Sequence, residues 1–198
     1  MNARLLSTVV VAMSISGCGG EGNASSADPD VLLAEAFVDV FYSFDEDRLA
    51  SLLSSAGASR LRLLEYQAWA EGGHYQVIDR MPCQAAEAGL VGCSITVRDD
   101  LIAALNLGWW VTDRFELDIE DGEILSVATS SNDPQVYLDA RAWVQENRSE
   151  LVAGPCAESP ETGVGQTPGL CAAAMTRGYR EFAASADFPD ELPAGPTS

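Results

Sequence analysis

The chain has 198 residues, of which 47% are hydrophobic, so it is long enough for one sizeable core and predicts a single globular domain. Its 30 acidic residues outnumber its 11 arginines, and with no lysine the formal net charge is −19, which repels nucleic acid and anionic lipid surfaces. The lack of lysine excludes Schiff-base chemistry and a P-loop, and the single histidine, His74, excludes a histidine-based metal cluster. We therefore expect no metal, no cofactor and no nucleic-acid partner.

The N-terminus has the composition of a targeting segment. Arg4 precedes the apolar run 5–15, which is too short to span a bilayer as a mature helix but is typical of a signal peptide. The residues Ile15-Ser16-Gly17-Cys18 resemble the lipobox of bacterial lipoproteins. The resemblance implies that residues 1–17 are removed as a lipoprotein signal peptide and that Cys18 is lipidated; an ordinary secretory signal is the alternative.

The residue after the lipidated cysteine bears on the location of the protein. Gly19 stands where lipoproteins retained in the inner membrane mainly have aspartate. The resemblance therefore implies a cell-envelope protein held by its lipid anchor in the outer membrane, facing the periplasm, if the host has two membranes. Residues 18–27 are mainly glycine, serine, alanine and asparagine, which predicts a flexible tether to a domain over residues 28–186.

Three helices are predicted before any strand. Asp28-Pro29 provides an N-cap and a proline in the first turn, and apolar residues then recur at helical spacing. Asp45 predicts the N-cap of a second, short helix that ends at Gly57. A third helix is expected over about residues 59–71.

The pattern then changes to the period of β-strands. Residues 74–81 and 90–98 predict two strands, and residues 109–131 predict a β-hairpin. The hairpin is indicated by Asp121-Gly122, because this pair lies between two β-rich runs and supplies the positive φ of a type I′ turn. The segment 99–106 fits either a continued strand or a helical turn.

The first strand of this hairpin has one apolar face and one polar face. The apolar residues at alternate positions are Trp109, Val111, Phe115, Leu117 and Ile119. Asp113 is the exception, because it shares their parity and directs a carboxylate toward the apolar side. A two-residue turn places Asp113 opposite Ser130. Trp110 has the other parity, so we expect it to pack under the C-terminal helices or to belong to a partner surface.

Two helices are predicted after the hairpin. Asp133-Pro134 repeats the cap-plus-proline pattern and opens a helix that runs to about Val152. A loop rich in glycine, proline and glutamate leads to a last helix over about residues 168–185. Residues 187–198 are rich in proline and predict a disordered tail.

This order of elements predicts an α+β fold in which N-terminal helices pack on a curved antiparallel sheet. Residues 31–131, and the hairpin sequence WWVTDRFELDIEDGEILSV in particular, resemble the cone-shaped, cystatin-like superfamily of nuclear transport factor 2, ketosteroid isomerase and the SnoaL-like polyketide cyclases. The resemblance implies a pocket between the helices and the concave face of the sheet. The helices after Asp133 would be an appendage, since compact members usually end with the sheet.

Five cysteines less the lipidated Cys18 leave an even number, which predicts two disulfides in an exported protein. Three pairings are possible. The spacing favours Cys83 with Cys93, across a loop between neighbouring antiparallel strands, and Cys156 with Cys171, across the loop rich in glycine and proline. A zinc site is the alternative, but the chain has no Cys-x-x-Cys spacing and a single histidine.

Six side chains are candidates for the pocket and its chemistry: Asp113, Tyr42, Tyr66, His74, Phe115 and Trp109. A carboxylate among apolar side chains is desolvated, which raises its pKa and makes Asp113 a candidate general acid or base. The structural alternatives for Asp113 are a buried hydrogen bond from Ser130 or exposure at the strand end. His74 also fits a surface position or a contact with a helix C-terminus, and the tryptophans also fit core and rim packing.

Together these observations favour a lipid-anchored extracytoplasmic domain, without catalytic activity, that binds a small apolar ligand or an envelope protein partner. One alternative is an enzyme of isomerase, cyclase or hydratase type in which Asp113 is the acid or base and Tyr42 or Tyr66 polarises a carbonyl. Another is an envelope scaffold whose contact surface consists of Trp110 and the C-terminal helices. Charged residues on the outer face of the hairpin favour a monomer.

Overall fold

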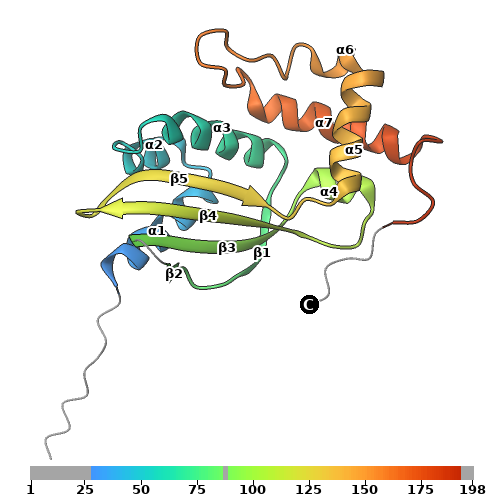
Figure 1. Cartoon of the computed structure of the whole chain (residues 1–198). Coiled ribbons are helices and arrows are strands. Elements are labelled where there is room, and N and C mark those ends of the chain that lie inside the picture. The colour runs from blue at the N-terminus through green and yellow to red at the C-terminus, as the bar shows by residue number, and fades with distance from the viewer. Residues whose placement is uncertain (1–27, 87–88, 193–198) are drawn as a thin grey trace, which may run out of the picture.

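The structure is a computed structural model that describes residues 28–86 and 89–192, and it has an α+β architecture (Figure 1). Seven helices and a five-stranded antiparallel sheet lie within these ranges, so the predicted α+β class is confirmed. The predicted signal peptide, the lipidated Cys18 and the tether lie outside the described residues. Among the helices that the structure describes, none is long and apolar enough to span a bilayer.

Three helices precede the sheet, as the sequence predicts. They are α1 (Pro29–Phe41), α2 (Glu46–Leu52) and α3 (Ala58–Gly72). The carboxylates of Asp28 and Asp45 accept hydrogen bonds from first-turn amides of α1 and α2, so both predicted caps are present. The prediction that Gly57 ends the second helix is wrong. Gly57 has a φ of +52° and directly precedes α3. Glycine adopts this left-handed conformation without the steric cost of a Cβ.

The sheet has the strand order β1-β3-β4-β5, with β2 paired to β3. Its strands are β1 (Gln76–Arg80), β2 (Gln84–Ala85), β3 (Leu90–Arg98), β4 (Val111–Glu120) and β5 (Glu123–Ser131). The sequence does not predict β2, because two residues are too few to show an alternating pattern. Alternate residues of β3 and β4 are buried, and Phe115 of β4 packs against Phe37 and Phe41 of α1.

The hairpin of β4 and β5 has the predicted turn but a different register. Asp121 and Gly122 both have a positive φ, of 51° and 76°, as a type I′ turn requires. An irregularity between Asp118 and Ile119 then shifts the pairing by one residue. Asp113 therefore lies opposite Ser131, and the predicted pairing with Ser130 is wrong.

The segment between β3 and β4 contains a helix, α4 (Asp100–Leu105), which Asp99 caps by accepting a hydrogen bond from the Ile102 amide. The two tryptophans predicted at the start of the hairpin precede β4 instead. Trp110 is 38% exposed, and the guanidinium of Arg98 lies 5.6 Å from the centroid of its ring. This cation–π contact supports Trp110 from within its own chain.

The C-terminal helices lie together at the end of the sheet where β5 finishes (Figure 1). They are α5 (Gln135–Asn147), α6 (Ser149–Val152) and α7 (Pro168–Ala183). The single helix predicted from Asp133 to Val152 is interrupted at Arg148, whose φ is −138°. The prediction that Asp133 caps this helix is wrong. Its carboxylate instead accepts a hydrogen bond from the Ser131 hydroxyl.

Two close contacts between helices hold this C-terminal group in place. A Cβ on Gly72 of α3 would lie 2.3 Å from the backbone of Gly169 in α7, and a Cβ on Gly178 of α7 would lie 2.4 Å from the Val144 side chain of α5. The glycines therefore permit a close approach of α3, α7 and α5 that any larger residue would obstruct. Part of the predicted disordered tail is also ordered, because the Trp143 indole donates a hydrogen bond to Asp187.

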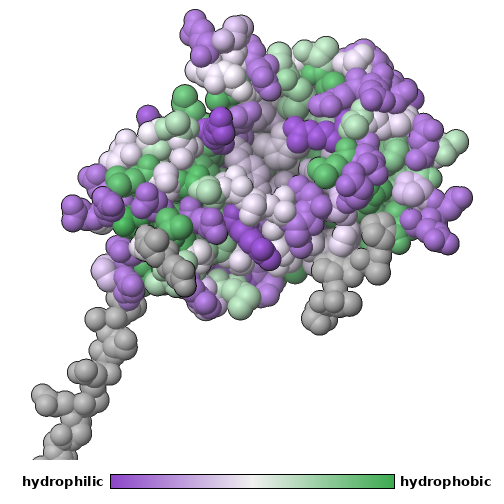
Figure 2. Space-filling view, viewed as in Figure 1, coloured by the Kyte–Doolittle hydropathy of each residue, from purple (hydrophilic) through white to green (hydrophobic). Residues whose placement is uncertain are grey.

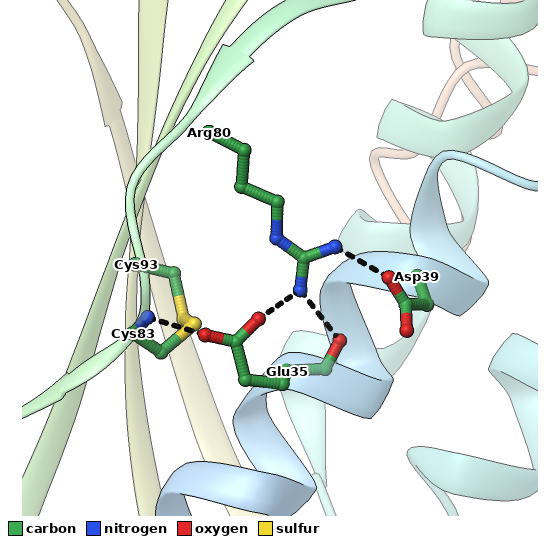
Figure 3. Close-up of a disulfide and its surroundings, with 5 residues drawn as sticks. All are labelled: Glu35, Asp39, Arg80, Cys83 and Cys93. Carbon is green, nitrogen blue, oxygen red and sulfur yellow. Dashed lines mark hydrogen bonds and ion pairs between the residues drawn. A yellow bond between two sulfur atoms is a disulfide. The ribbon is translucent and has the colours of Figure 1, made fainter.

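The structure has two disulfides, Cys83–Cys93 and Cys156–Cys171, which is the pairing that the spacing favours. Disulfides persist in oxidising compartments, so they fit a non-cytoplasmic domain. The first disulfide lies beside an ion-pair cluster in which Arg80 binds the carboxylates of Glu35 and Asp39 (Figure 3). This cluster connects α1 to the edge of the sheet.

Candidate functional site

The strongest candidate site is a pocket of about 350 Å³ between α3, α5 and the end of the sheet, which we call the Asp113 pocket. It is lined by Arg62, Glu65, Tyr66, Trp69, Tyr75, Asp113, Thr129, Ser130, Ser131, Asp133, Tyr137 and Arg141. Figure 2 shows a hollow in this face of the molecule, with pale surface inside and purple, hydrophilic side chains around it. The lining thus combines an aromatic wall with a few polar and charged groups.

Asp113 is the most buried charged side chain of this lining, with 2% of its surface exposed. β4 places it there because its side chain shares the face of Phe115, and pairing with Ile95 on one side and Ser131 on the other keeps it within the sheet. The Tyr42 hydroxyl donates a hydrogen bond of 2.7 Å to Asp113 Oδ2. Burial raises the pKa of the Asp113 carboxyl to about 6, and Asp133 adds to the rise, whereas the hydroxyls of Tyr42 and Tyr66 oppose it.

Tyr42 is held in this position by the end of α1. It is the C-cap residue of that helix, and the preceding carbonyls of Val40 and Phe41 accept hydrogen bonds of 3.1 and 2.9 Å from the buried Gln67 side chain of α3. These bonds satisfy carbonyl groups that a helix end leaves without partners. Burial, followed by the nearby Asp113, raises the pKa of the Tyr42 hydroxyl, so it stays protonated and acts as a donor.

Three more tyrosines, Tyr66, Tyr75 and Tyr137, form the aromatic wall with Trp69. The rings of Tyr66 and Tyr75 are perpendicular, with centroids 6.4 Å apart. Burial is the largest cause that raises the pKa of each tyrosine hydroxyl, and neighbouring groups add to it: Asp113 for Tyr66, Asp99 for Tyr75 and Tyr75 itself for Tyr137. These hydroxyls are therefore neutral donors at neutral pH.

Two arginines at the pocket, Arg62 of α3 and Arg141 of α5, are solvent-exposed. Within residues 28–86 and 89–192, neither guanidinium makes an ion pair or a hydrogen bond. The Glu65 carboxylate beside them is already engaged, because it accepts a hydrogen bond of 2.7 Å from the Gly165 amide. The arginines therefore keep their donors available at the mouth of the pocket.

The structure brings together four of the six predicted residues, Asp113, Tyr42, Tyr66 and Phe115, and separates His74 and Trp109 from the pocket. Asp113 and Tyr66 line the pocket. Tyr42 does not line it but donates a hydrogen bond to Asp113. Phe115 is fully buried in the core next to them. His74 does not line this pocket; its largely exposed ring lies 2.8 Å from Asp100.

Trp109 also lies outside the Asp113 pocket. It precedes β4 and is not among the lining residues. Its indole nitrogen is buried without a hydrogen-bond partner in the part of the chain that the structure describes. The strand parity that placed Trp109 beside Asp113 does not apply, because the strand begins only at Val111.

Ten of the twelve lining residues were not predicted as site residues, among them Arg62, Tyr75, Tyr137 and Arg141. Tyr137 and Arg141 are four residues apart on α5, so helical spacing alone puts them on one face. That spacing was visible in the sequence, but the contact of α5 with the sheet end was not.

Comparisons with protein-family models, with curated proteins and with solved structures find no match to this chain. Over the described ranges, no group of three or more histidine, cysteine, aspartate or glutamate side chains could hold a metal ion.

Proposed function

We propose that this chain is a lipid-anchored extracytoplasmic domain that binds a small ligand in the Asp113 pocket without catalysing a reaction. The observation that carries the proposal is a buried carboxylate at the base of a pocket of about 350 Å³ with an aromatic wall. Small-molecule sites typically combine such a concave wall with a few convergent polar groups. Asp113, the tyrosine hydroxyls and the two arginines are those groups here.

The domain belongs, in this proposal, to the cone-shaped superfamily that the sequence of residues 31–131 resembles. The antiparallel sheet and the contact of α1 with β3 and of α3 with β5 support this assignment. The C-terminal helices are then more than an appendage, because Tyr137 and Arg141 of α5 complete the pocket.

The lipid anchor at Cys18 is supported by the lipobox-like sequence and by two disulfides, which are typical of an oxidising compartment. Its test is Cys18→Ala in cells that export the chain. We expect the wild-type protein in the membrane fraction and the variant in the soluble extracytoplasmic fraction. A variant that stays in the membrane fraction would contradict the anchor.

The binding function is tested by mass spectrometry of the purified chain under native and then denaturing conditions. We expect the native mass to exceed the denatured mass by roughly the mass of a drug-sized ligand. Asp113→Asn should lose this excess, whereas Asp118→Asn, a matched change on the polar face of the same strand, should keep it. Equal native and denatured masses for the wild-type chain would argue against the proposal.

An enzyme of isomerase, cyclase or hydratase type is the second candidate, and one observation favours it. The pKa of Asp113, raised to about 6 by burial, suits proton transfer near neutral pH, and Tyr66 beside it can donate to a carbonyl oxygen. Turnover of a carbonyl substrate that Asp113→Asn abolishes and Asp118→Asn preserves would favour this candidate over simple binding.

A further inference from the structure

We infer that the ligand of the Asp113 pocket is an organic molecule with a single ammonium group, which binds between Asp113 and the tyrosine rings. This inference rests on the proposed binding function and adds the chemical class of the ligand. It follows from three features of the lining: the carboxylates at its base, the aromatic rings of its wall and the arginines at its mouth.

Three carboxyl groups lie in or near the inner part of the pocket. Asp113 and Asp133 both line it, and Asp99, which is 2% exposed, lies near its wall. Their effects on the surrounding groups agree in sign: Asp133 raises the pKa of Asp113, and Asp99 and Asp133 raise the pKa values of both Tyr75 and Tyr137. The carboxylates therefore disfavour a further negative charge on Asp113, Tyr75 or Tyr137. For the same reason they attract a positive charge that enters the inner part of the pocket.

The base of the pocket can accept a further donor. A carboxylate has roughly four lone-pair sites, and the contacts of Asp113 with Tyr42 and Tyr66 do not use all of them. An ammonium group has three N–H donors and no acceptor, so it matches an acceptor that only neutral hydroxyls now contact. A ligand carboxylate in this position would instead face Asp113 directly.

The wall suits a cation as well. The faces of aromatic rings carry a negative partial charge that attracts ammonium groups within about 6 Å. Tyr66, Tyr75, Tyr137 and Trp69 supply four rings to one pocket, and the perpendicular rings of Tyr66 and Tyr75 present surfaces of different orientation. The same rings provide contact area for an apolar ligand body.

The mouth of the pocket restricts the ligand to one positive charge. Arg62 and Arg141 are exposed there and make no ion pair with a described residue. They repel a second ammonium group at the far end of a ligand, and they favour a neutral or anionic end. A diamine is therefore a poorer fit than a monoamine.

The test compares three probes of similar size, phenethylammonium, 2-phenylethanol and phenylacetate, by calorimetric titration of the purified chain at about pH 8. We expect phenethylammonium to bind about tenfold more tightly than the alcohol and phenylacetate to bind most weakly. Asp113→Asn should remove the preference for the amine, and Asp118→Asn should retain it. Arg141→Gln should improve binding of the diamine 1,4-diaminobutane, because one of the two positive charges at the mouth is removed.

The outcomes separate this inference from the binding function on which it rests. If the alcohol or the acid binds as well as the amine, and Asp113→Asn weakens that binding, the pocket binds ligands but the ammonium class is wrong. If none of the three probes binds at about 10 mM although the native mass shows a retained ligand, the ammonium class is wrong and the proposed function stands. Absence of both probe binding and a retained ligand would contradict both.

Discussion

Two carboxylates, Glu35 and Asp113, lie in different electrostatic surroundings in this molecule. Glu35 of α1 binds the guanidinium of Arg80, and its other oxygen accepts a hydrogen bond from the amide of Cys83, next to the Cys83–Cys93 disulfide (Figure 3). Asp113 has only hydroxyl groups as partners and no ion pair with any described residue. The first group has its charge compensated, and the second does not.

This difference separates a region that stabilises the fold from a region that is available for a ligand. Charge-assisted hydrogen bonds to a partly buried carboxylate stabilise the folded state, so the cluster of Glu35, Arg80 and the disulfide fastens α1 to the sheet edge. A buried carboxylate without a cation costs stability when it ionises. The ionised Asp113 carboxylate therefore does not stabilise the fold, in contrast to that of Glu35.

The largest expected effect on stability comes from the disulfide at the sheet edge. Replacing Cys83 and Cys93 together by alanine should lower the free energy of unfolding by about 3 kcal/mol, because it removes a short closed loop from the unfolded chain. Chemical denaturation measures this loss. Probe binding to the remaining folded protein should be unchanged, and a loss of binding as large as the loss of stability would show that the two regions are not separable.

Glu35→Gln should lower the free energy of unfolding by about 2 kcal/mol, because Arg80 and the Cys83 amide lose their anionic partner. Asp39→Asn is the matched control, since its carboxylate is 68% exposed and contributes about 0.5 kcal/mol or less. Equal effects of the two substitutions in denaturation curves would contradict the role of Glu35.

Asp113→Asn should stabilise the protein, in contrast to the two preceding substitutions. We expect it to raise the free energy of unfolding at about pH 8 by roughly 1–2 kcal/mol. Because burial raises the folded-state pKa of Asp113 to about 6, the stability from its protonated form is complete below pH 3.8 and is lost as the pH rises through about 6. The groups that face it are Tyr42, Tyr66 and Asp133.

The measurement is the difference in unfolding free energy between wild type and Asp113→Asn from about pH 4 to pH 8. Asp99 has its pKa raised by burial over the same range, so only the difference isolates Asp113. Asp118→Asn, on the polar face of the same strand, is the matched control substitution. A difference curve that is flat in pH for Asp113→Asn would mean that the carboxylate is not desolvated.

The smallest effect is expected for Tyr42→Phe. Its hydroxyl lowers the pKa of Asp113 through a hydrogen bond of 2.7 Å, so its removal should raise that pKa further and cost about 1 kcal/mol of stability at about pH 8. Carboxyl chemical shifts of Asp113 in an NMR titration report the change. A lowered pKa would show that Tyr42 does not stabilise the charged form.

The sequence by itself determined most of the local elements and the orientation of Asp113. Three features depend only on residues close together in the chain: the alternation along β4, the Asp121-Gly122 turn and the caps at Asp28 and Asp45. They can therefore be predicted without knowledge of the tertiary structure. The inward orientation of Asp113 follows from strand parity alone.

The tertiary structure decided what surrounds that carboxylate. The irregularity at Asp118 and Ile119 moved its cross-strand partner from Ser130 to Ser131, since one unpaired residue displaces every later pair. The close packing at Gly72 and Gly178 brought α5, and with it the pocket-lining Tyr137 and Arg141, over the sheet end. Such contacts join segments far apart in the chain, and their geometry depends on how whole helices fit together rather than on any local pattern.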